Sequence, residues 1–306
     1  MSIEVHSLTK TFGTQVAVDH INFSVGKGEI VGFLGPNGAG KSTTMKMITG
    51  YLLPDEGNIS ICGLDVLRQP IESRRKIGYL PESNPLYYDM YVKEFLSFIG
   101  GIYRVDQRMK KVEEVIEQTG LGEEQSKKIG QLSKGYKQRV GLAHALIHDP
   151  EVLILDEPIS GLDPNQLVEI RDLILEIGRS KTVLFSTHIM QEVEAICDRV
   201  IIINKGKIVA DDLIDKLQRP SGDKEILQIL LDRPLSIDAF KQINGLNAVN
   251  SLGPAVFVLE FDPSQDIRPA LFEMVKRMDR KILEMTVVHE GVEEVFRKLT
   301  EDNRSS

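Results

Sequence analysis

The sequence predicts an α/β fold, in which a mixed or parallel β-sheet is covered by helices, followed by a smaller α+β module. Over about the first 215 residues, short apolar β segments alternate with segments of helical periodicity, a pattern typical of strands connected across a sheet by helices. Residues 218–223 (Gln-Arg-Pro-Ser-Gly-Asp) have the composition of a linker, and shorter elements follow them. A length of 306 residues suits two domains, and we expect them at 1–217 and 218–306.

The first domain is predicted to start its central sheet with residues 29–34 (EIVGFL), an apolar strand that enters a glycine-rich turn. A helix follows from Lys41 to Gly50, and residues 75–80 form another strand. From about 84 to 150, apolar residues recur mainly at helical spacing, which predicts a helical subdomain. The remaining elements expected here are a helix over 136–147, strands over 151–155 and 182–185 with a helix over 166–177 between them, and a hairpin over 200–209.

The second domain is predicted to have the order strand, helix, strand, strand, helix, strand, with one further helix. That order resembles a split βαβ, ferredoxin-like module. The expected elements are a strand over 225–231, a helix capped by Ser236, two strands within 245–261, a helix after 266–269, a strand over 281–288 and a helix over 292–299.

Charge and composition exclude several classes of function. The chain has 37 Lys and Arg against 45 Asp and Glu, a net charge of −8, which argues against a nucleic-acid partner because such binding depends on clustered basic residues. No apolar stretch approaches the roughly 18 residues that span a bilayer, and the N-terminus lacks a signal pattern. Both cysteines lie in apolar surroundings, as expected for core residues in a reducing compartment.

The glycine-rich turn has the spacing GxxxxGK[ST], with a predicted strand before it and a helix after it. In this pattern the backbone N–H groups and the positive end of the helix dipole form a concave anion site. Lys41 is expected to reach the β- and γ-phosphates of a nucleotide, and the Ser42 hydroxyl is expected on Mg²⁺. The predicted loop consists of Gly35, Pro36, Asn37, Gly38, Ala39, Gly40, Lys41, Ser42 and Thr43.

The strand over 151–155 runs into two adjacent carboxylates, Asp156 and Glu157. Acids at the end of a buried apolar strand are costly unless cations or ligands meet them. Asp156 is therefore expected near Mg²⁺, and Glu157 as the general base that polarises an attacking water. The alternative is that either acid only caps a helix.

Three further motifs follow in order: 132–136 (Leu-Ser-Lys-Gly-Tyr) with Gln138-Arg139, 160–163 (Ser-Gly-Leu-Asp), and 186–188 (Ser-Thr-His). With these motifs, residues 1 to about 215 resemble the nucleotide-binding subunit of an ABC transporter. Together with 82–87 and 292–296, the whole pattern is most similar to the gliding-motility-associated ATP-binding subunits of Bacteroidetes, within the drug and polysaccharide exporter group.

The resemblance implies a subunit that binds and hydrolyses ATP with Mg²⁺, powers a separate membrane permease, and pairs with a second copy when ATP is bound. It places the subunit in the cytoplasm, peripheral on the cytoplasmic face of the inner membrane. It also implies that Ser133 and Gly135 bind the γ-phosphate held by the opposite subunit and that Asp163 lies at the dimer seam. His188 would contact the γ-phosphate and Phe12 would stack on adenine, although each alone would be interpreted as a packing residue.

Two positions depart from the family pattern. The signature usually reads LSGGQ, and here Lys134 and Tyr136 replace its middle glycine and its glutamine. Glu82 stands where a glutamine is expected after residues 77–81. Its carboxylate can still ligate Mg²⁺ as a hard oxygen donor, and we expect it to link the metal site to the helical subdomain.

The segment around Glu82 is expected to carry a bend and an apolar run. Pro81 and Pro85 fix the backbone, which leaves Ser83 and Asn84 as the place to bend. The apolar residues after it are either core beneath the helical subdomain or an exposed docking patch for the permease. They are Leu86, Tyr87, Tyr88, Met90 and Tyr91.

Two other classes of protein fit the sequence less well. A soluble ABC ATPase acting on ribosomes, DNA or iron–sulfur assembly is the main alternative, and the single phosphate loop, the net charge and the lack of a CxxC pair count against it. A P-loop GTPase lacks support because residues 204–207 (Asn-Lys-Gly-Lys) have Lys where the guanine motif needs Asp.

Overall fold

A computed structural model describes residues 1–217, 225–262, 264–288 and 296 of the chain. The chain divides into two compact units, Met1–Leu213 and Ile214–Ser306. The boundary falls four residues before the expected position at 217, because the short helix α8 (Ile214–Leu217) groups with the second unit.

The centre of the first unit is a six-stranded sheet with the order β10-β9-β3-β8-β7-β6. The four contacts among β9, β3, β8, β7 and β6 are parallel and β10 is antiparallel to β9, so the sheet is mixed. Every residue of β7 and β8 is buried, which explains their continuous apolar sequence. The strands are β3 (Ile30–Leu34), β6 (Ile77–Leu80), β7 (Val152–Asp156), β8 (Thr182–Thr187), β9 (Arg199–Asn204) and β10 (Lys207–Leu213).

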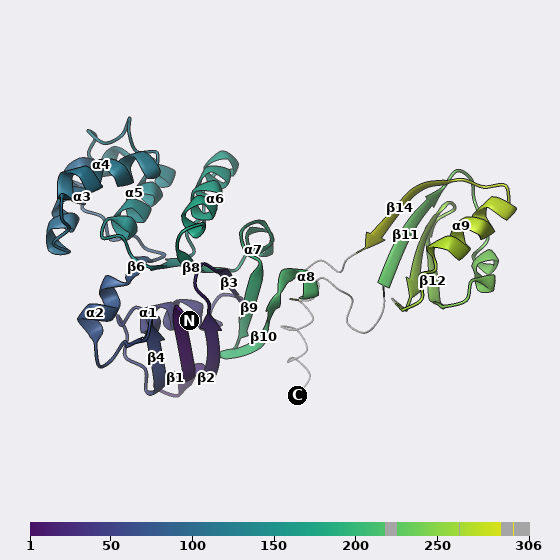
Figure 1. Ribbon diagram of the computed structural model, residues 1–306, viewed down its shortest axis with the longest axis horizontal. Helices are drawn as coiled ribbons and strands as arrows, with labels where there is room; N and C mark the ends of the chain where they lie inside the picture. Colours follow the sequence, from purple (N-terminus) through teal and green to yellow (C-terminus); the bar gives the residue numbers. More distant parts are fainter. Residues whose placement is uncertain (218–224, 263, 289–295, 297–306) are drawn as a thin grey trace. The chain divides into compact units, whose positions relative to one another are not determined.

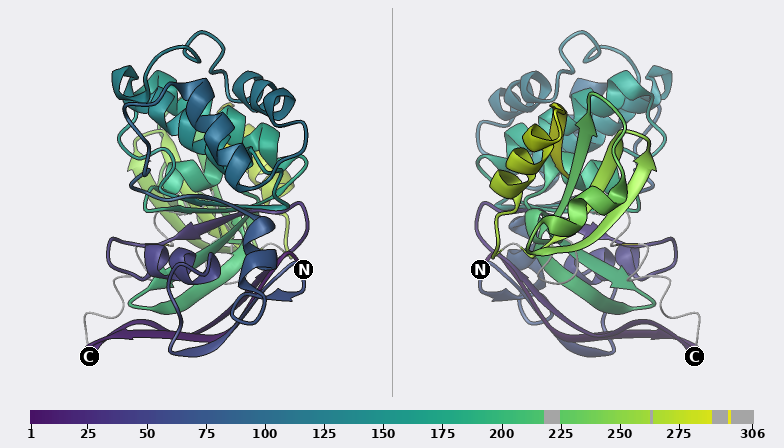
Figure 2. Two further views of the ribbon diagram at one scale, coloured as in Figure 1. Left: turned by 90° about the vertical axis from the view of Figure 1, so that its left-hand side faces the viewer. Right: turned by 90° about the vertical axis from the view of Figure 1, so that its right-hand side faces the viewer.

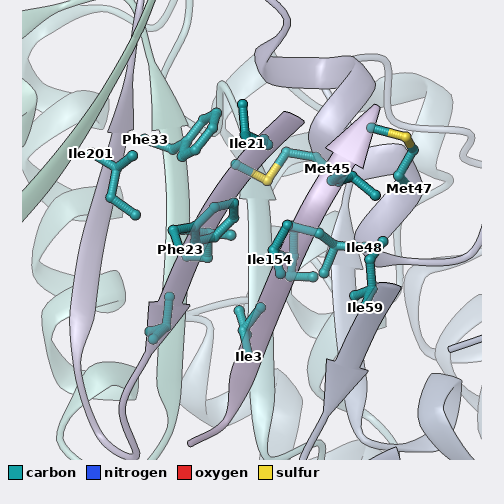
Figure 3. Packing of buried hydrophobic residues seen from close by; sticks show 14 of the residues in the cluster. Ile3, Ile21, Phe23, Phe33, Met45, Met47, Ile48, Ile59, Ile154 and Ile201 are labelled. Carbon is teal, nitrogen blue, oxygen red and sulfur yellow. The ribbon is translucent and has the colours of Figure 1, made fainter. Parts of the chain in front are cut away.

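A second, antiparallel sheet with the order β2-β1-β4-β5 faces the first across helix α1. Met45, Met47 and Ile48 of α1 lie between apolar side chains of the two sheets (Figure 3). None of these strands is among the individually predicted elements. Their bounds, with that of the helix, are β1 (Ile3–Phe12), β2 (Gln15–Val25), β4 (Glu56–Ile61), β5 (Leu64–Asp65) and α1 (Lys41–Ile48).

The helical subdomain lies between β6 and β7 in sequence and forms a separate group of helices at one end of the first unit (Figures 1 and 2). Among the described residues of this segment the only β pairing is the bridge between Tyr91 and Lys128. Two further helices, α6 and α7, connect the last parallel strands. The helices are α2 (Pro70–Arg75), α3 (Val92–Ile102), α4 (Arg108–Gln118), η1 (Ile129–Gln131), α5 (Lys134–Leu146), α6 (Pro164–Gly178) and α7 (Met190–Ile196).

The second unit contains an antiparallel sheet with the order β12-β13-β11-β14. Its core joins the sheet to α9 and η2. The helix expected after Ser236 is a 3₁₀ helix: its buried residue Phe240 and the buried residue that follows its end, Ile243, lie three apart, which matches one 3₁₀ turn. The elements are β11 (Glu225–Leu231), η2 (Ile237–Gln242), β12 (Leu246–Gly253), β13 (Val256–Phe261), α9 (Arg268–Arg277) and β14 (Ile282–Val288).

The linker expected at 218–223 and the helix expected at 292–299 lie outside the continuously described residues. The ferredoxin-like assignment of the second unit stays a prediction. Within the described ranges, no helix is both long and apolar enough to cross a membrane.

Candidate active site

The glycine-rich turn connects β3 to α1 and can be built only with glycine at two positions. A Cβ on Gly35 would lie 2.4 Å from the carbonyl oxygen of Ile203. Gly40 has a φ of +113° and its Cβ would lie 2.5 Å from the carbonyl oxygen of Ala17. The loop therefore wraps tightly around the start of α1, where unpaired N–H groups can bind an anion.

Lys41 begins α1 and turns its ammonium back into the loop. Its side chain is 6% exposed, and Nζ lies 2.7 Å from the carbonyl oxygen of Gly35 and 3.3 Å from that of Pro36. The same ammonium is 3.5 Å from Oε1 of Glu157. The predicted phosphate clamp and the predicted base are therefore neighbours within one subunit.

Asp156 ends β7 and is joined to two hydroxyl groups. Ser42 donates to its Oδ1 at 3.1 Å and Ser186, from β8, donates to the same oxygen at 2.6 Å. The side chain of Asp156 is buried. It does not cap a helix, so the alternative interpretation of this acid is wrong.

Glu157 follows in a left-handed conformation with a φ of +51°, which is unusual for a residue other than glycine and often found at functional sites. Its N–H donates to both the carbonyl and the hydroxyl oxygen of Ser186. The carboxylate is 8% exposed, and its two oxygens lie 3.0 and 2.8 Å from Nδ1 of His188. Glu157 is thus held between Lys41 and His188, and it too does not cap a helix.

A groove of about 540 Å³ connects these groups. Ten of the residues predicted for the site line it: Phe12, Asn37, Gly38, Gly40, Lys41, Ser42, Thr43, Glu82, Glu157 and His188. The other loop residues, Gly35, Pro36 and Ala39, form the loop behind this lining. Asp156 lines a neighbouring cavity that shares Ser42 and Glu82 with the groove.

Phe12 ends β1 at the rim of the groove, with about half of its surface exposed. The ammonium of Lys10 lies 5.7 Å from its ring centroid. An exposed aromatic ring beside a phosphate loop offers a flat face to a base, which is the role that the resemblance implies for Phe12.

The residues present fit a Mg²⁺ ion that is completed by phosphate and water. The described residues contain no cluster of three His, Cys, Asp or Glu side chains that could hold a metal on its own. Mg²⁺ commonly uses one or two protein oxygens together with phosphate oxygens. Ser42 and Asp156 would hold it, with Glu82 at the edge of the same space. There it would supply charge neutralisation for the phosphates.

Ser133, Gly135 and Asp163 do not line the groove. Ser133 caps α5 by accepting from the N–H of Tyr136, and Asp163 caps α6 by accepting from the N–H groups of Asn165 and Gln166. The two caps lie close together, because a Cβ on Gly135 would lie 2.6 Å from the Gln166 side chain. The expectation that they act on a nucleotide held by another subunit stays a prediction.

The segment 81–85 is attached more firmly than the sequence suggests. Asn84 donates to the carbonyl oxygen of Lys137 at 3.3 Å, and a Cβ on Gly141 would collide with its amide nitrogen. The bend falls at Glu82 and Ser83, so Asn84, whose side chain packs on α5, is not part of the expected bend. Glu82 is exposed and lies between the groove and α5.

Ser186 is the functional residue that sequence analysis left without a role. It contacts both Asp156 and Glu157, as described above, and it is fully buried. Two features could have indicated a role for Ser186. It comes immediately before Thr187 and His188 in the motif 186–188, and its strand, β8, lies beside β7.

The amino-acid sequence is also similar to those of known proteins. Residues 18–160 match the ABC transporter family. An uncharacterised ABC transporter ATP-binding protein, YhcH of Bacillus subtilis, is 30% identical over 99% of this chain and 97% of its own length. YxlF of the same organism, likewise uncharacterised, is 43% identical over 67% of this chain and 69% of its own length. The bacitracin transport ATP-binding protein BcrA of Bacillus licheniformis is 40% identical over 71% of each chain.

Among solved structures, a dimeric ATP-binding cassette, MJ0796, bound to ADP and Pi in a post-hydrolysis state, is 26% identical with a TM-score of 0.63. The match covers 69% of this chain and 98% of that one. The fold and the site define a P-loop ATPase of the ATP-binding cassette class. The chain belongs to the ABC transporter ATP-binding protein family.

Proposed function

We propose that this chain is the subunit that hydrolyses ATP to power a separate membrane permease of the exporter type. The observation that carries the proposal is the single groove in which the phosphate loop, Glu157 and His188 meet. The exporter class is supported by relatives such as the bacitracin transport protein. The permease would be a second chain, which places this subunit on the cytoplasmic face of the membrane.

The chemistry follows from the geometry. Lys41 would hold the β- and γ-phosphates, and Glu157 would accept the proton of the attacking water. His188, which touches both oxygens of that carboxylate, would orient Glu157 and donate to the γ-phosphate. The adenine would lie on Phe12.

A second copy is expected to complete each site. Ser133 and Asp163 are exposed helix caps outside the groove of their own subunit, Gly135 lies buried in the first turn of α5, and a solved relative is dimeric with ADP and Pi. We propose that these residues contact the nucleotide held by the partner, so that two ATP molecules join two subunits.

Substitution of Glu157 tests the enzyme assignment. Glu157→Gln should lower steady-state hydrolysis at least about 100-fold, because it removes the general base, while it preserves ATP binding and yields an ATP-dependent dimer in light scattering. Lys41→Ala should weaken both binding and hydrolysis. Unchanged turnover in Glu157→Gln would contradict the assignment, and a monomer under saturating ATP and Mg²⁺ would contradict the composite sites.

The permease would dock beside segment 81–85. Three tyrosines there, Tyr87, Tyr88 and Tyr91, are about half exposed, whereas Leu86 is buried. The tyrosines are therefore not core, which favours the docking interpretation for them. Next to them, a cavity of about 730 Å³ is lined by Pro81, Glu82, Ser83 and Pro85 together with α5.

Co-purification tests this part of the proposal. The subunit should be recovered from detergent-solubilised membranes with one membrane protein and lose it when Tyr87 and Tyr91 are changed to Ser. Glu82→Ala should reduce permease-stimulated ATPase in liposomes more than the ATPase of the subunit alone. Recovery with ribosomes instead would favour the soluble alternative. The link to gliding motility stays a sequence-based prediction.

A further inference from the structure

A buried acid, Glu192, lies four residues after His188 in the sequence and has no part in the chemistry described above. It belongs to the first turn of α7 and is 5% exposed. Its Oε2 accepts a hydrogen bond from the Thr187 hydroxyl at 2.5 Å. Its Oε1 has no hydrogen-bond partner among the described residues.

Glu192 differs from the other buried acids of the described chain. Asp156 is joined to two hydroxyl groups and Glu124 is paired with Lys127. Glu192 has no ion pair with any described Lys or Arg. Burial of a half-satisfied carboxylate costs free energy, and burial, reinforced by the charge of Glu157, raises the pKa of Glu192. A residue kept at such a cost needs an explanation.

Thr187, the partner of Glu192, controls the backbone on both sides of its neighbour His188. Its hydroxyl oxygen accepts from the N–H of Ile189 at 3.0 Å, while its carbonyl oxygen accepts from the N–H of Gly35 at 3.3 Å. The threonine hydroxyl makes both bonds at once, because a hydroxyl group has one donor proton and two acceptor lone pairs. The bond to Glu192 therefore helps to hold the Thr187 side chain where its oxygen meets the N–H of Ile189.

Helix α7, which carries Glu192, is packed tightly against the central sheet. Helix α7 packs on β3 at Gly32, where a Cβ would lie 2.9 Å from the Val193 side chain, and Val193 is completely buried. Because interiors are close-packed, this contact restricts the movement of the turn of α7 that carries Glu192.

We propose that Glu192 is a positioning residue for hydrolysis, which holds the His188 ring against Glu157 through the Thr187 hydroxyl. The chain of contacts runs from Glu192 to Thr187, through the peptide to His188, and from the His188 Nδ1 to the Glu157 carboxylate at 2.8 Å. The inference rests on the proposed role of His188.

The test compares two substitutions of Glu192 in the full chain. Glu192→Ala should lower kcat roughly tenfold, because small misplacements of a catalytic group are costly, and should leave KM for ATP within about twofold. Glu192→Gln should keep at least half of kcat, since its amide oxygen still accepts from Thr187. Glu194→Ala, on the exposed side of the same helix, is the matched control and should leave kcat unchanged.

Combination with His188→Ala separates positioning from general damage. If Glu192 acts only through His188, then Glu192→Ala should cause no further loss of kcat in the His188→Ala background. Thr187→Val, which keeps the shape of threonine and removes the hydroxyl, provides the same test if Glu192→Ala does not fold.

Four results would overturn the inference. Losses of kcat that multiply in the double variant would show that Glu192 acts independently of His188. A Glu192→Gln enzyme as slow as Glu192→Ala would exclude the hydrogen bond as the cause. A normal Glu192→Ala with an impaired His188→Ala would overturn this inference alone, whereas a normal His188→Ala would contradict the proposed role of His188 as well.

Discussion

One serine side chain bonds both acidic residues of the site, one through its carboxylate and the other through its backbone N–H. The Ser186 hydroxyl donates to Asp156 at 2.6 Å and accepts from the N–H of Glu157 at 3.2 Å. A left-handed backbone conformation costs free energy for a residue with a Cβ. The contact with the Glu157 N–H stabilises that conformation. Ser186 therefore links the position of the expected metal ligand to the position of the expected base.

Removal of this hydroxyl should impair hydrolysis more than nucleotide binding. Ser186→Ala should lower the free energy of unfolding by about 1–3 kcal/mol, because it leaves buried polar groups without a partner, and should lower kcat about tenfold by loosening Glu157. Urea unfolding and ATPase assays over a range of Mg²⁺ concentrations measure the two effects. Ser180→Ala, at an exposed serine two residues beyond α6, is the control, and equal behaviour of the two variants would refute the role.

At the scale of elements, helix α5 joins the helical subdomain to the central sheet. A Cβ on Gly78 of β6 would lie 2.2 Å from the carbonyl oxygen of Ala145, so the helix and the strand approach without a side chain between them. Two histidines, His144 and His148, lie at this contact. The His144 ring meets Phe95 edge to face and His148 stacks on Tyr103.

These histidines should make stability depend on pH. Burial lowers the pKa of His144 from 6.5 to about 4, and burial also lowers the pKa of His148. Below pH 6.5 the unfolded chain binds protons that the folded chain does not, so stability should fall as the pH drops toward about 4, by up to about 1.4 kcal/mol per pH unit from His144, and His148 should act in the same direction. Urea unfolding at several pH values should give a shallower decline for His144→Gln than for the wild type. Parallel curves would show that His144 does not contribute.

The elements also show how far the sequence determines the structure. The parallel strands and the phosphate loop could be predicted because their signals are local: an apolar run such as 151–155, or glycines at fixed spacing. The antiparallel sheet could not be predicted strand by strand from the sequence. Its strands β1 and β2 mix buried and exposed residues, and their pairing contains register shifts. The attachment of Asn84 to α5 and the contacts of Ser186 arise from pairings between distant segments, which no local pattern encodes.

At the scale of the whole molecule, the chain consists of two units that each have a core of their own. The first core joins both sheets to α1, and the second joins a four-stranded sheet to α9 and η2. All the residues proposed to bind or hydrolyse ATP belong to the first unit. The second unit contributes none of the described groove lining, so we expect it to regulate the subunit or to stabilise its dimer.

Truncation after Leu217 should therefore leave a working enzyme. The shortened chain keeps the first core, so it should unfold cooperatively, bind ATP with a Kd within about threefold of the full chain, and retain basal hydrolysis, because a domain with its own core folds by itself. The measurements are thermal unfolding, nucleotide titration and steady-state ATPase, with Glu157→Gln in the same truncated chain as the inactive control. If the second unit stabilises the dimer, the truncated Glu157→Gln chain should also need more ATP to dimerise than the full-length variant. A truncated chain that unfolds cooperatively and yet fails to bind ATP would show that the second unit contributes directly to the site.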